Sequence, residues 1–396
     1  MVTEDNSFGT NEFMELCKLI GCEPDIAGNV GSESVQEMSA WIEYLNATGE
    51  SSVTDLRKAT GHETPWKIKF WGVENESWGC GGTMTAQYYS NLYRRYASFC
   101  KDYSGAPLWK IASGPSGDDT SWMRPLLENI PAGMLWGISL HYYTVPTGDW
   151  SHKGSATHFD EAEYFGTLER ALQMKNIIED QEAVMNRYDK NKKIALVVDE
   201  WGVWTDAEPH TNPAFLYQQN SLRDALVAAS TLNIFNNHSD RVKMAELAQT
   251  VNVLQSLILT KGKQIVLTPT YDVFDLYQVY QNAHFLPIKL TAPKYSFNGQ
   301  EIEAVNASAS LDSSGTIHIS LVNLDPSKTI ALQAHLKGAT RNKATGEILT
   351  SAHFDDFNSF EAPQKVSLKQ FNDFKSQGTT ITINLPPKSV IMLSIK

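Results

Sequence analysis

The sequence predicts a parallel α/β domain over residues 1–284, followed by an antiparallel β-sandwich domain over residues 285–396. In the first part, short apolar runs alternate with segments of helical periodicity, which is typical of parallel βαβ units. In the second part, apolar and polar residues alternate, which is typical of half-buried antiparallel strands. The chain has 396 residues, 42% of them hydrophobic, so its length suffices for one large domain and a smaller one.

Near-continuous apolar runs in the first part predict strands that are covered on both faces, as in a parallel sheet. They lie at residues 25–30, 68–73, 108–112, 135–142 and 194–198. A sixth strand is expected either within residues 242–254 or at residues 264–269.

The segments between these runs have helical periodicity. One helix begins after the capping-box pair Ser34 and Glu37. Two longer helices are expected at residues 160–187 and 216–235. Another helix has a stripe of apolar side chains that consists of Tyr88, Leu92, Tyr96 and Phe99.

The strands of the second part alternate in polarity with a period of two. Ile317, Ile319 and Leu321 are separated by polar residues, and residues 381–385 and 391–395 repeat the pattern. Turn-forming clusters separate these runs, so we expect a sandwich of antiparallel strands.

Charge and composition exclude several classes of protein. Lys and Arg number 33 and Asp and Glu number 45, so the net charge of −12 argues against a nucleic acid or an anionic membrane as partner. No apolar run is long enough to span a bilayer. The polar N-terminus is not a signal peptide, and four cysteines without a C-x-x-C pair indicate a reduced, cytoplasmic protein. No H-E-x-x-H sequence or His/Cys cluster is present, and we expect neither a metal nor a cofactor.

The α/β part could be a doubly wound sheet or a barrel. No G-x-G-x-x-G or P-loop sequence follows any predicted strand, which weakens the nucleotide-binding, doubly wound alternative. A barrel fits better if polar residues gather at the carboxyl ends of the strands, where barrel enzymes carry their chemistry.

Two predicted strands end in acidic clusters that are surrounded by tryptophan. Glu74, Glu76 and Trp78 follow the strand at 68–73, and Glu200 and Trp204 follow the strand at 194–198. A single Glu at a strand end is more often a cap or an ion-pair partner. Two matched clusters favour a function, because hydrolysis of a glycosidic bond needs one protonated and one ionised carboxyl group, and apolar walls raise a carboxyl pKa.

His141 and Tyr143 lie at the end of a third strand. Because they are two residues apart, both side chains point to the same side of that strand. They could orient a carboxylate by hydrogen bonds, or they could be a buried polar pair in the core of the barrel.

Two sequence blocks resemble the retaining α-L-arabinofuranosidases of glycoside hydrolase family 51. They are FWGVENESWGCGG at residues 70–82 and VVDEWGVW at residues 197–204. Shorter matches occur in the family's order along essentially the whole chain: FGTNEFM at 8–14, GNVG at 28–31, DRVKM at 240–244, QTVNVL at 249–254 and LTPTY at 267–271.

The resemblance implies a (β/α)8-type TIM barrel with a C-terminal β-sandwich, and an exo-acting enzyme that removes terminal arabinofuranosyl residues from arabinan, arabinoxylan or their oligosaccharides. It implies that Glu200 is the nucleophile and Glu76 the general acid/base of a double displacement. The two carboxyl groups should then be about 5–5.5 Å apart. The residues implied to bind substrate are Asn75, which would contact the sugar 2-hydroxyl, His141, Tyr143 and Trp204.

The resemblance also implies that the first two βα units are missing, because the family places them before FGT at residues 8–10. The count of six strands agrees, so we expect an incomplete barrel of about six βα units with two open edges and a tendency to form homo-oligomers. Two alternatives stay open: another retaining glycosidase of the same clan, such as an endo-glucanase or xylosidase, or an inactive sugar-binding or structural remnant.

Overall fold

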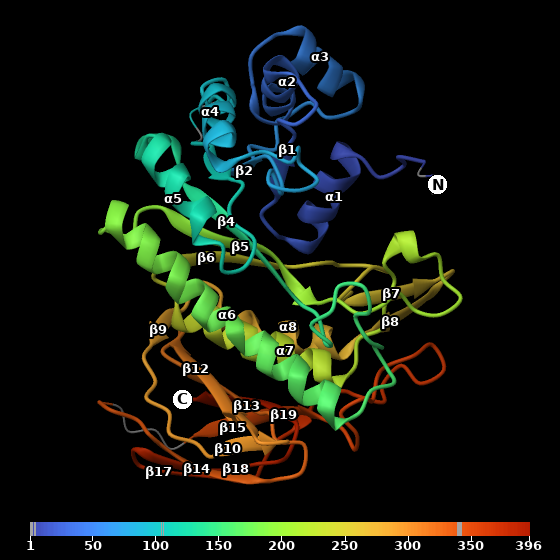
Figure 1. Cartoon of the computed structure of the whole chain (residues 1–396), viewed down its shortest axis with the longest axis vertical. Helices are drawn as coiled ribbons and strands as arrows, with labels where there is room; N and C mark the ends of the chain where they lie inside the picture. Colours follow the sequence, from blue (N-terminus) through green and yellow to red (C-terminus); the bar gives the residue numbers. More distant parts are fainter. Residues whose placement is uncertain (1–2, 4, 104, 106, 339–342) are drawn as a thin grey trace. The chain divides into compact units, whose positions relative to one another are not determined.

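A computed structural model describes residues 3, 5–103, 105, 107–338 and 343–396 (Figure 1). Its strands β1 to β6 form one sheet in chain order, and the pairs β1–β2, β2–β3 and β3–β4 are parallel. The bounds are β1 Asp25–Gly28, β2 Phe70–Val73, β3 Trp109–Ala112, β4 Gly137–Thr144, β5 Ala195–Val203 and β6 Val242–Leu247. The sheet of six strands, with β1 and β6 at its ends, is that of an incomplete barrel, as the sequence predicted.

The sixth strand lies in the first of the two expected positions. Residues 264–269 contain instead β8 Gln264–Leu267, which pairs with β7 Ile258–Lys261 in a separate two-stranded sheet.

The predicted end of β5 at residue 198 is wrong. The strand continues to Val203, so Glu200 lies inside it rather than in a loop after it. The polar pair at 199–200 suggested a strand end, but buried Trp201 and Val203 resume the strand, and the N–H of Trp204 donates to the carbonyl of Thr144 at 3.0 Å. β4 likewise continues past His141 to Thr144.

The chain divides into two compact units: Met1–His141 with Ile177–Val198, and Tyr142–Asn176 with Asp199–Lys396. Three elements contribute residues to both units, namely β4, β5 and the helix α6 Glu161–Tyr188. The other helices of the first unit are α1 Thr10–Ile20, α2 Val35–Asn46, α3 Ser52–Ala59, α4 Ala86–Ala97, α5 Thr120–Asn129 and the 3-10 turn η1 Ala132–Met134.

The predicted capping box of α2 is confirmed. The N–H of Glu37 donates to Ser34 Oγ at 3.2 Å, and the N–H of Ser34 donates to the Glu37 carboxylate at 2.7 Å. The predicted apolar stripe of α4 is confirmed for buried Tyr96 and wrong for Tyr88 and Phe99, which are exposed, while Tyr89 and Tyr93 are fully buried. The hydroxyl groups of the two fully buried tyrosines donate to backbone carbonyls, which makes their burial inexpensive.

An aromatic group joins the amino-terminal ends of the strands in the first unit. Phe70 of β2 and Trp109 of β3 have ring centroids 5.2 Å apart, and Trp109 stacks on Trp136 at 5.1 Å. These apolar contacts hold β2, β3 and β4 at the end opposite to the polar residues that follow β2.

The second unit is rich in antiparallel strands (Figure 1). A six-stranded sheet has the order β16-β15-β19-β13-β12-β9, a three-stranded sheet the order β14-β18-β17, and β10 pairs with β11. The bounds are β9 His284–Leu286, β10 Lys294–Phe297, β11 Gln300–Glu303, β12 Val305–Leu311, β13 Ile317–Asn323, β14 Ile330–His335, β15 Ala344–Thr350, β16 Lys369–Gln370, β17 Phe374–Gln377, β18 Thr380–Leu385 and β19 Ser389–Ile395. The three predicted strands fall within β13, β18 and β19.

The expectation that these strands are half-buried is wrong for β13, which is buried along its whole length. The helix α7 Leu222–Asn237 covers its polar face, where Asn233 Oδ1 accepts hydrogen bonds from Ser308 and Ser320. α7 begins at residue 222 rather than 216, because Ser221 and Asp224 form a capping box there. The remaining helices of this unit are α8 Pro269–Tyr277 and the 3-10 turns η2 Pro213–Phe215 and η3 Gln278–Tyr280.

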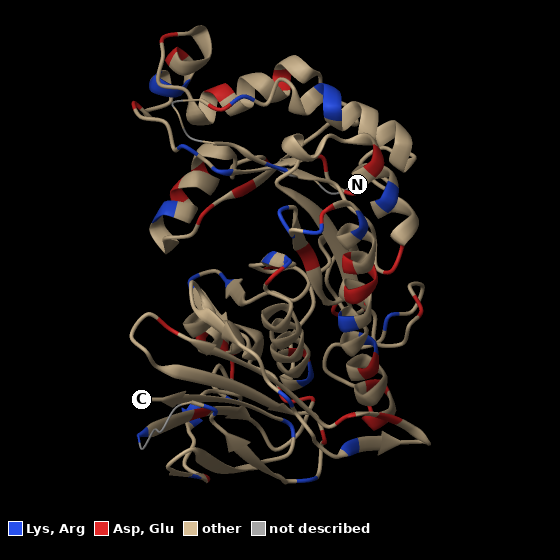
Figure 2. Cartoon of the chain, turned by 90° about the vertical axis from the view of Figure 1, so that its left-hand side faces the viewer, with Lys and Arg blue, Asp and Glu red and all other residues tan. Residues whose placement is uncertain are grey.

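Acidic and basic residues are interspersed over helices, strands and loops (Figure 2). Among the residues that the structure describes, no helix combines the length and the apolar character needed to cross a membrane. All four cysteines are free thiols.

Candidate active site

The loop after β2 carries Glu76 on a backbone that is folded tightly. Glu74 and Glu76 have positive φ angles of 97° and 44°, which cost a residue other than glycine about 1–3 kcal/mol each. The carbonyl of Glu76 accepts the N–H groups of Gly79 at 2.8 Å and Gly81 at 3.0 Å. Strained backbone of this kind is common at functional sites.

Two glycines make this folding possible. A Cβ atom on Gly81 would lie 2.1 Å from the carbonyl oxygen of Asn75, and one on Gly31 would lie 2.6 Å from the carbonyl oxygen of Gly81. A side chain at position 81 would therefore disrupt the turn within the loop after β2, and one at position 31 would push the loops after β1 and β2 apart.

Two hydrogen bonds fix the rest of the loop to the end of β3. The N–H of Ser77 donates to Ser113 Oγ at 3.1 Å, and the indole Nε1 of Trp78 donates to the carbonyl of Gly114 at 3.0 Å. The part of the loop that follows Glu76 is thus held against the end of β3.

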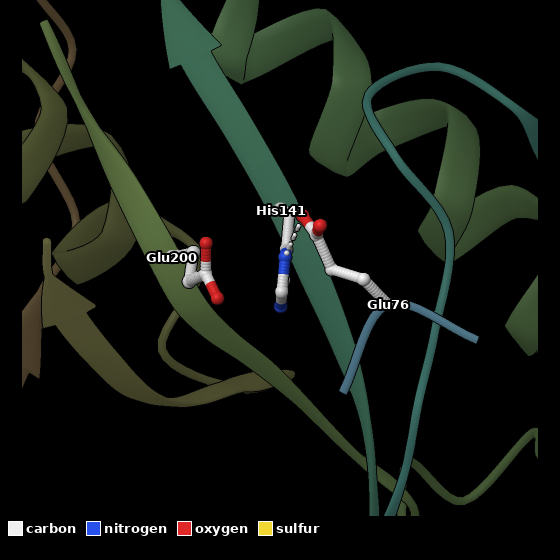
Figure 3. A group of neighbouring side chains, drawn as sticks. All are labelled: Glu76, His141 and Glu200. Atoms are coloured by element: carbon white, nitrogen blue, oxygen red, sulfur yellow. Dashed lines mark hydrogen bonds and ion pairs between the residues drawn. The ribbon is translucent and has the colours of Figure 1, made fainter. Parts of the chain in front are cut away.

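The carboxylate of Glu76 has two hydrogen-bond donors. Nδ1 of His141 lies 2.9 Å from Oε1 (Figure 3). Sγ of Cys80 donates to Oε2 at 3.4 Å. The side chain of His141 is only 4% exposed and that of Glu76 is 21% exposed. The hydrogen bond from His141 lowers the pKa of Glu76, and the nearby imidazole charge and the Cys80 thiol act in the same direction, against the effect of burial.

His141 is itself held by the backbone. Its N–H donates to the carbonyl of Pro115 at 3.2 Å, and its carbonyl accepts the N–H of Gly117 at 2.8 Å. The ring of Trp78 lies edge-on to the imidazole, with centroids 6.5 Å apart. The imidazole therefore meets Glu76 in a fixed orientation.

In the second unit, Glu200 has a different partner. The hydroxyl of Tyr143 donates to Glu200 Oε2 at 2.7 Å, a normal length for an O–H···O hydrogen bond. The rings of Tyr143 and Trp204 pack edge to face at 4.9 Å, and Trp150 packs on Trp204 at 5.5 Å. Ammonium Nζ of Lys153 lies over the rings of Trp150 and Trp204. Tyr143, the partner of Glu200, thus belongs to a row of packed aromatic rings that continues through Trp204 to Trp150.

The hydrogen bonds that the sequence suggested for His141 and Tyr143 are present. His141 binds the carboxylate of Glu76, and Tyr143 binds that of Glu200. Asn75 is half-buried, and its N–H donates to Glu74 Oε1 at 3.1 Å. The chemical roles of these residues stay predictions.

Sequence reasoning missed two residues of the loop. Glu74 was noted only as part of an acidic cluster, although its carboxylate is buried and bound by backbone N–H groups. Cys80 was counted only as a thiol. The spacing of four residues between Glu76 and Cys80 could have indicated contact in a helix, but no helical pattern surrounds them.

Glu76, His141 and Glu200 carry the oxygen and nitrogen atoms that metal ions use as ligands. The same groups are those of acid–base and nucleophilic chemistry, which needs no metal. The expectation of no metal and no cofactor stays a prediction.

Known protein families match both parts of the chain. The family described as the α-L-arabinofuranosidase 1 domain matches residues 1–163, and the family described as the α-L-arabinofuranosidase C-terminal domain matches residues 199–389. An intracellular exo-α-L-arabinofuranosidase from Bacteroides ovatus is 48% identical over 394 residues, which cover 99% of this chain and 76% of the relative.

Solved structures are similar as well. A GH51 arabinofuranosidase from Xanthomonas axonopodis pv. citri has a TM-score of 0.97 and 44% identity, over 100% of this chain and 80% of that one. An arabinose complex of an α-L-arabinofuranosidase from Thermotoga maritima has a TM-score of 0.82 and 26% identity, over 99% of this chain and 79% of that one.

Proposed function

Because the chain belongs to glycoside hydrolase family 51, the α-L-arabinofuranosidases, we propose that it is an exo-acting retaining arabinofuranosidase. Its substrates are arabinan, arabinoxylan or their oligosaccharides, from which it removes terminal non-reducing α-L-arabinofuranosyl residues. The observation that carries this proposal is the pair of glutamates with separate, well-formed hydrogen-bond partners, Glu76 with His141 and Glu200 with Tyr143.

Glu200 is the nucleophile. The hydroxyl of Tyr143 donates to Oε2 and orients the carboxylate, which attacks the anomeric carbon. The C–O bond to the leaving sugar breaks as the bond from Glu200 forms, and the product is a covalent arabinosyl-enzyme.

Glu76 is the acid and then the base. It gives a proton to the departing oxygen in the first step and takes one from water in the second, which releases arabinose with retained configuration. The hydrogen bond from His141 lowers the pKa of Glu76, which suits the base step directly. The acid step requires the pKa to rise in the complex, and a bound sugar that expels water from around the carboxyl group raises it.

Asn75 and Trp204 complete the proposed sugar site. The Asn75 side chain binds the sugar 2-hydroxyl, and the Trp204 ring stacks against the sugar. His141 and Tyr143 position the two carboxylates and offer further polar contacts.

The test is hydrolysis of p-nitrophenyl α-L-arabinofuranoside, with a Glu200→Ala variant as control. The configuration of the first product, followed by proton NMR, should be that of the substrate. Activity no higher than that of the control would support the inactive-remnant alternative. Activity confined to β-glucosides or β-xylosides would support another glycosidase of the clan.

The retaining mechanism also predicts carboxyl groups about 5–5.5 Å apart for Glu76 and Glu200. A crystal structure with a bound inhibitor measures this separation, and a value near 9 Å would favour an inverting mechanism.

Three expectations about the whole protein belong to this proposal. The catalytic domain covers residues 1–284 and the β-sandwich domain covers residues 285–396. The enzyme acts in the cytoplasm, and the relative from Bacteroides ovatus, which is described as intracellular, supports this location. It forms homo-oligomers through the strands that end its sheet, and a monomer by light scattering at micromolar concentration would count against that.

A further inference from the structure

Glu74 is a buried carboxylate two residues before the proposed acid/base Glu76. It is only 8% exposed, and backbone N–H groups surround it. Its Oε2 accepts the N–H groups of Val30 and of Gly31, the latter at 2.8 Å, and its Oε1 accepts the N–H of Asn75 at 3.1 Å. Val30 and Gly31 follow β1, so this single side chain joins the loops after β1 and β2.

The presence of a carboxylate here is costly. Burial raises the pKa of Glu74, which means that the surroundings penalise its charged form, and the three N–H donors only oppose that effect. The nearby Glu33 carboxylate raises the pKa further. In addition, the φ angle of 97° is one that glycine adopts without strain and glutamate does not. What this buried side chain gains at that cost is its hydrogen bonds to the loops after β1 and β2.

We infer that Glu74 is a positioning residue for Glu76. This inference rests on the proposed function of Glu76 as the acid/base. By binding the loop after β1 and the N–H of Asn75 at once, it fixes the backbone from which the Glu76 side chain leaves. The Glu76 carboxyl group then meets His141 Nδ1 and Cys80 Sγ.

The packing around Glu74 supports this inference. Oε1 of Glu74 lies 3.1 Å from the position of a Cβ on Gly81, so the carboxylate fills the space beside the turn rather than projecting into solvent. Without it, the N–H groups of Val30 and Gly31 lose their acceptor, and the turn at residues 74–76 loses its attachment to the loop after β1.

A displaced Glu76 has a characteristic kinetic signature. A shift of about 1 Å in a catalytic group can lower the rate about 100-fold. The loss should depend on the leaving group, because an aryl leaving group such as p-nitrophenolate departs with little help from an acid, whereas a sugar alcohol does not.

The experiment compares Glu74→Gly and Glu74→Gln with the wild-type enzyme on arabinobiose and on p-nitrophenyl α-L-arabinofuranoside. Glu74→Gly removes the three hydrogen bonds and relieves the strained φ angle, whereas Glu74→Gln keeps one acceptor oxygen and the shape of the side chain. Glu33→Gln is the matched control, because it removes an exposed carboxylate from the same neighbourhood. Thermal unfolding of each variant is recorded, and Glu74→Gln carries the test if Glu74→Gly does not fold.

We expect Glu74→Gly to lower kcat/KM about 100-fold on arabinobiose and less than about 10-fold on the aryl substrate. Glu74→Gln should give a smaller loss with the same preference, and Glu33→Gln should stay within about twofold of wild type. An equal loss on both substrates would overturn the inference, because it would show a merely structural role, and so would the absence of any loss.

A crystal structure of a Glu74 variant separates this inference from the proposed function. The hydrogen bond between Glu76 and His141, 2.9 Å in the wild type, should be broken. An intact bond would overturn the positioning role even if the enzyme is active. A wild-type enzyme that hydrolyses no arabinofuranoside would instead overturn the proposed function, whatever the variant structure shows.

Discussion

The regions that carry Glu76 and Glu200 are built in different ways. Glu76 stands on a loop with positive φ angles at residues 74 and 76, whereas Glu200 lies inside the regular strand β5. Glu76 is bound by an imidazole and a thiol, and Glu200 by a phenol. The comparison teaches that two chemically identical side chains can be assigned different roles by their supports. A regular strand and one phenol hold the proposed nucleophile, whereas a tightly folded loop and two donors hold the proposed acid/base, whose pKa depends on those donors.

The largest effect is expected when the carboxylate of Glu200, which lies in strand β5, is removed. Glu200→Ala should lower kcat on the order of 10⁴-fold or more on every arabinofuranoside, because no covalent intermediate can form without the nucleophile. Steady-state kinetics on aryl and oligosaccharide substrates measure it. Added azide should restore turnover of the aryl substrate and give an arabinosyl azide of inverted configuration, whereas a retained configuration would assign the nucleophile elsewhere.

The loss of activity when the carboxylate of Glu76 is removed should depend on the substrate. Glu76→Ala should lower kcat/KM about 10²- to 10⁴-fold on arabinobiose and much less on the p-nitrophenyl substrate, because only the sugar leaving group needs protonation. With azide, the product should keep the configuration of the substrate. If both variants gave the same azide product, the contrast between the two glutamates would be lost.

The next largest effect is expected from Tyr143, whose hydroxyl donates to Glu200. Tyr143→Phe removes one hydrogen bond to a charged group, worth about 1.5–3 kcal/mol, so kcat should fall about 10- to 100-fold. The loss should be equal on good and poor leaving groups, unlike that of the Glu76 variant. A change in KM alone would show that Tyr143 contacts the sugar and does not position the nucleophile.

The support of Glu76 should appear in the pH profile. The hydrogen bond from His141 is the main cause that lowers the pKa of Glu76, so His141→Ala should raise that pKa. The limb of the kcat/KM profile that reports Glu76 should therefore move to higher pH. If this limb of the pH profile did not move, in a variant that unfolds at the wild-type temperature, His141 would not be the residue that lowers the pKa of Glu76.

The smallest effect belongs to Cys80. A thiol is a weak donor, so Cys80→Ala should shift the same limb upward by less than His141→Ala does, and kcat/KM should change less than about threefold. Cys80→Ser keeps a donor and serves as the control. If Cys80→Ala had a larger effect than His141→Ala, Cys80 rather than His141 would be the main donor that lowers the pKa of Glu76.

Much of this arrangement could be predicted from residues close together in the chain. The apolar runs located five strands of the first sheet and left two positions open for the sixth, and the acidic clusters at two predicted strand ends indicated Glu76 and Glu200. The spacing of His141 and Tyr143 placed both on one side of a strand, and each side chain binds one of the carboxylates. Errors arose where neighbours in space overrule local pattern. β5 continues through two polar residues because Trp201 and Val203 are buried, and β13 is buried on both faces because α7 covers it.

The sequence by itself determined which residues could do the chemistry, because strand periodicity and the composition of strand ends are local properties. Only the tertiary structure decided how the Glu76 loop is held. The bonds from Glu74 to the loop after β1 join residues more than forty positions apart, and the thiol of Cys80 reaches Glu76 through a turn of unusual backbone angles. Such contacts depend on how distant segments fold against each other, which the pattern of residues within either segment does not contain.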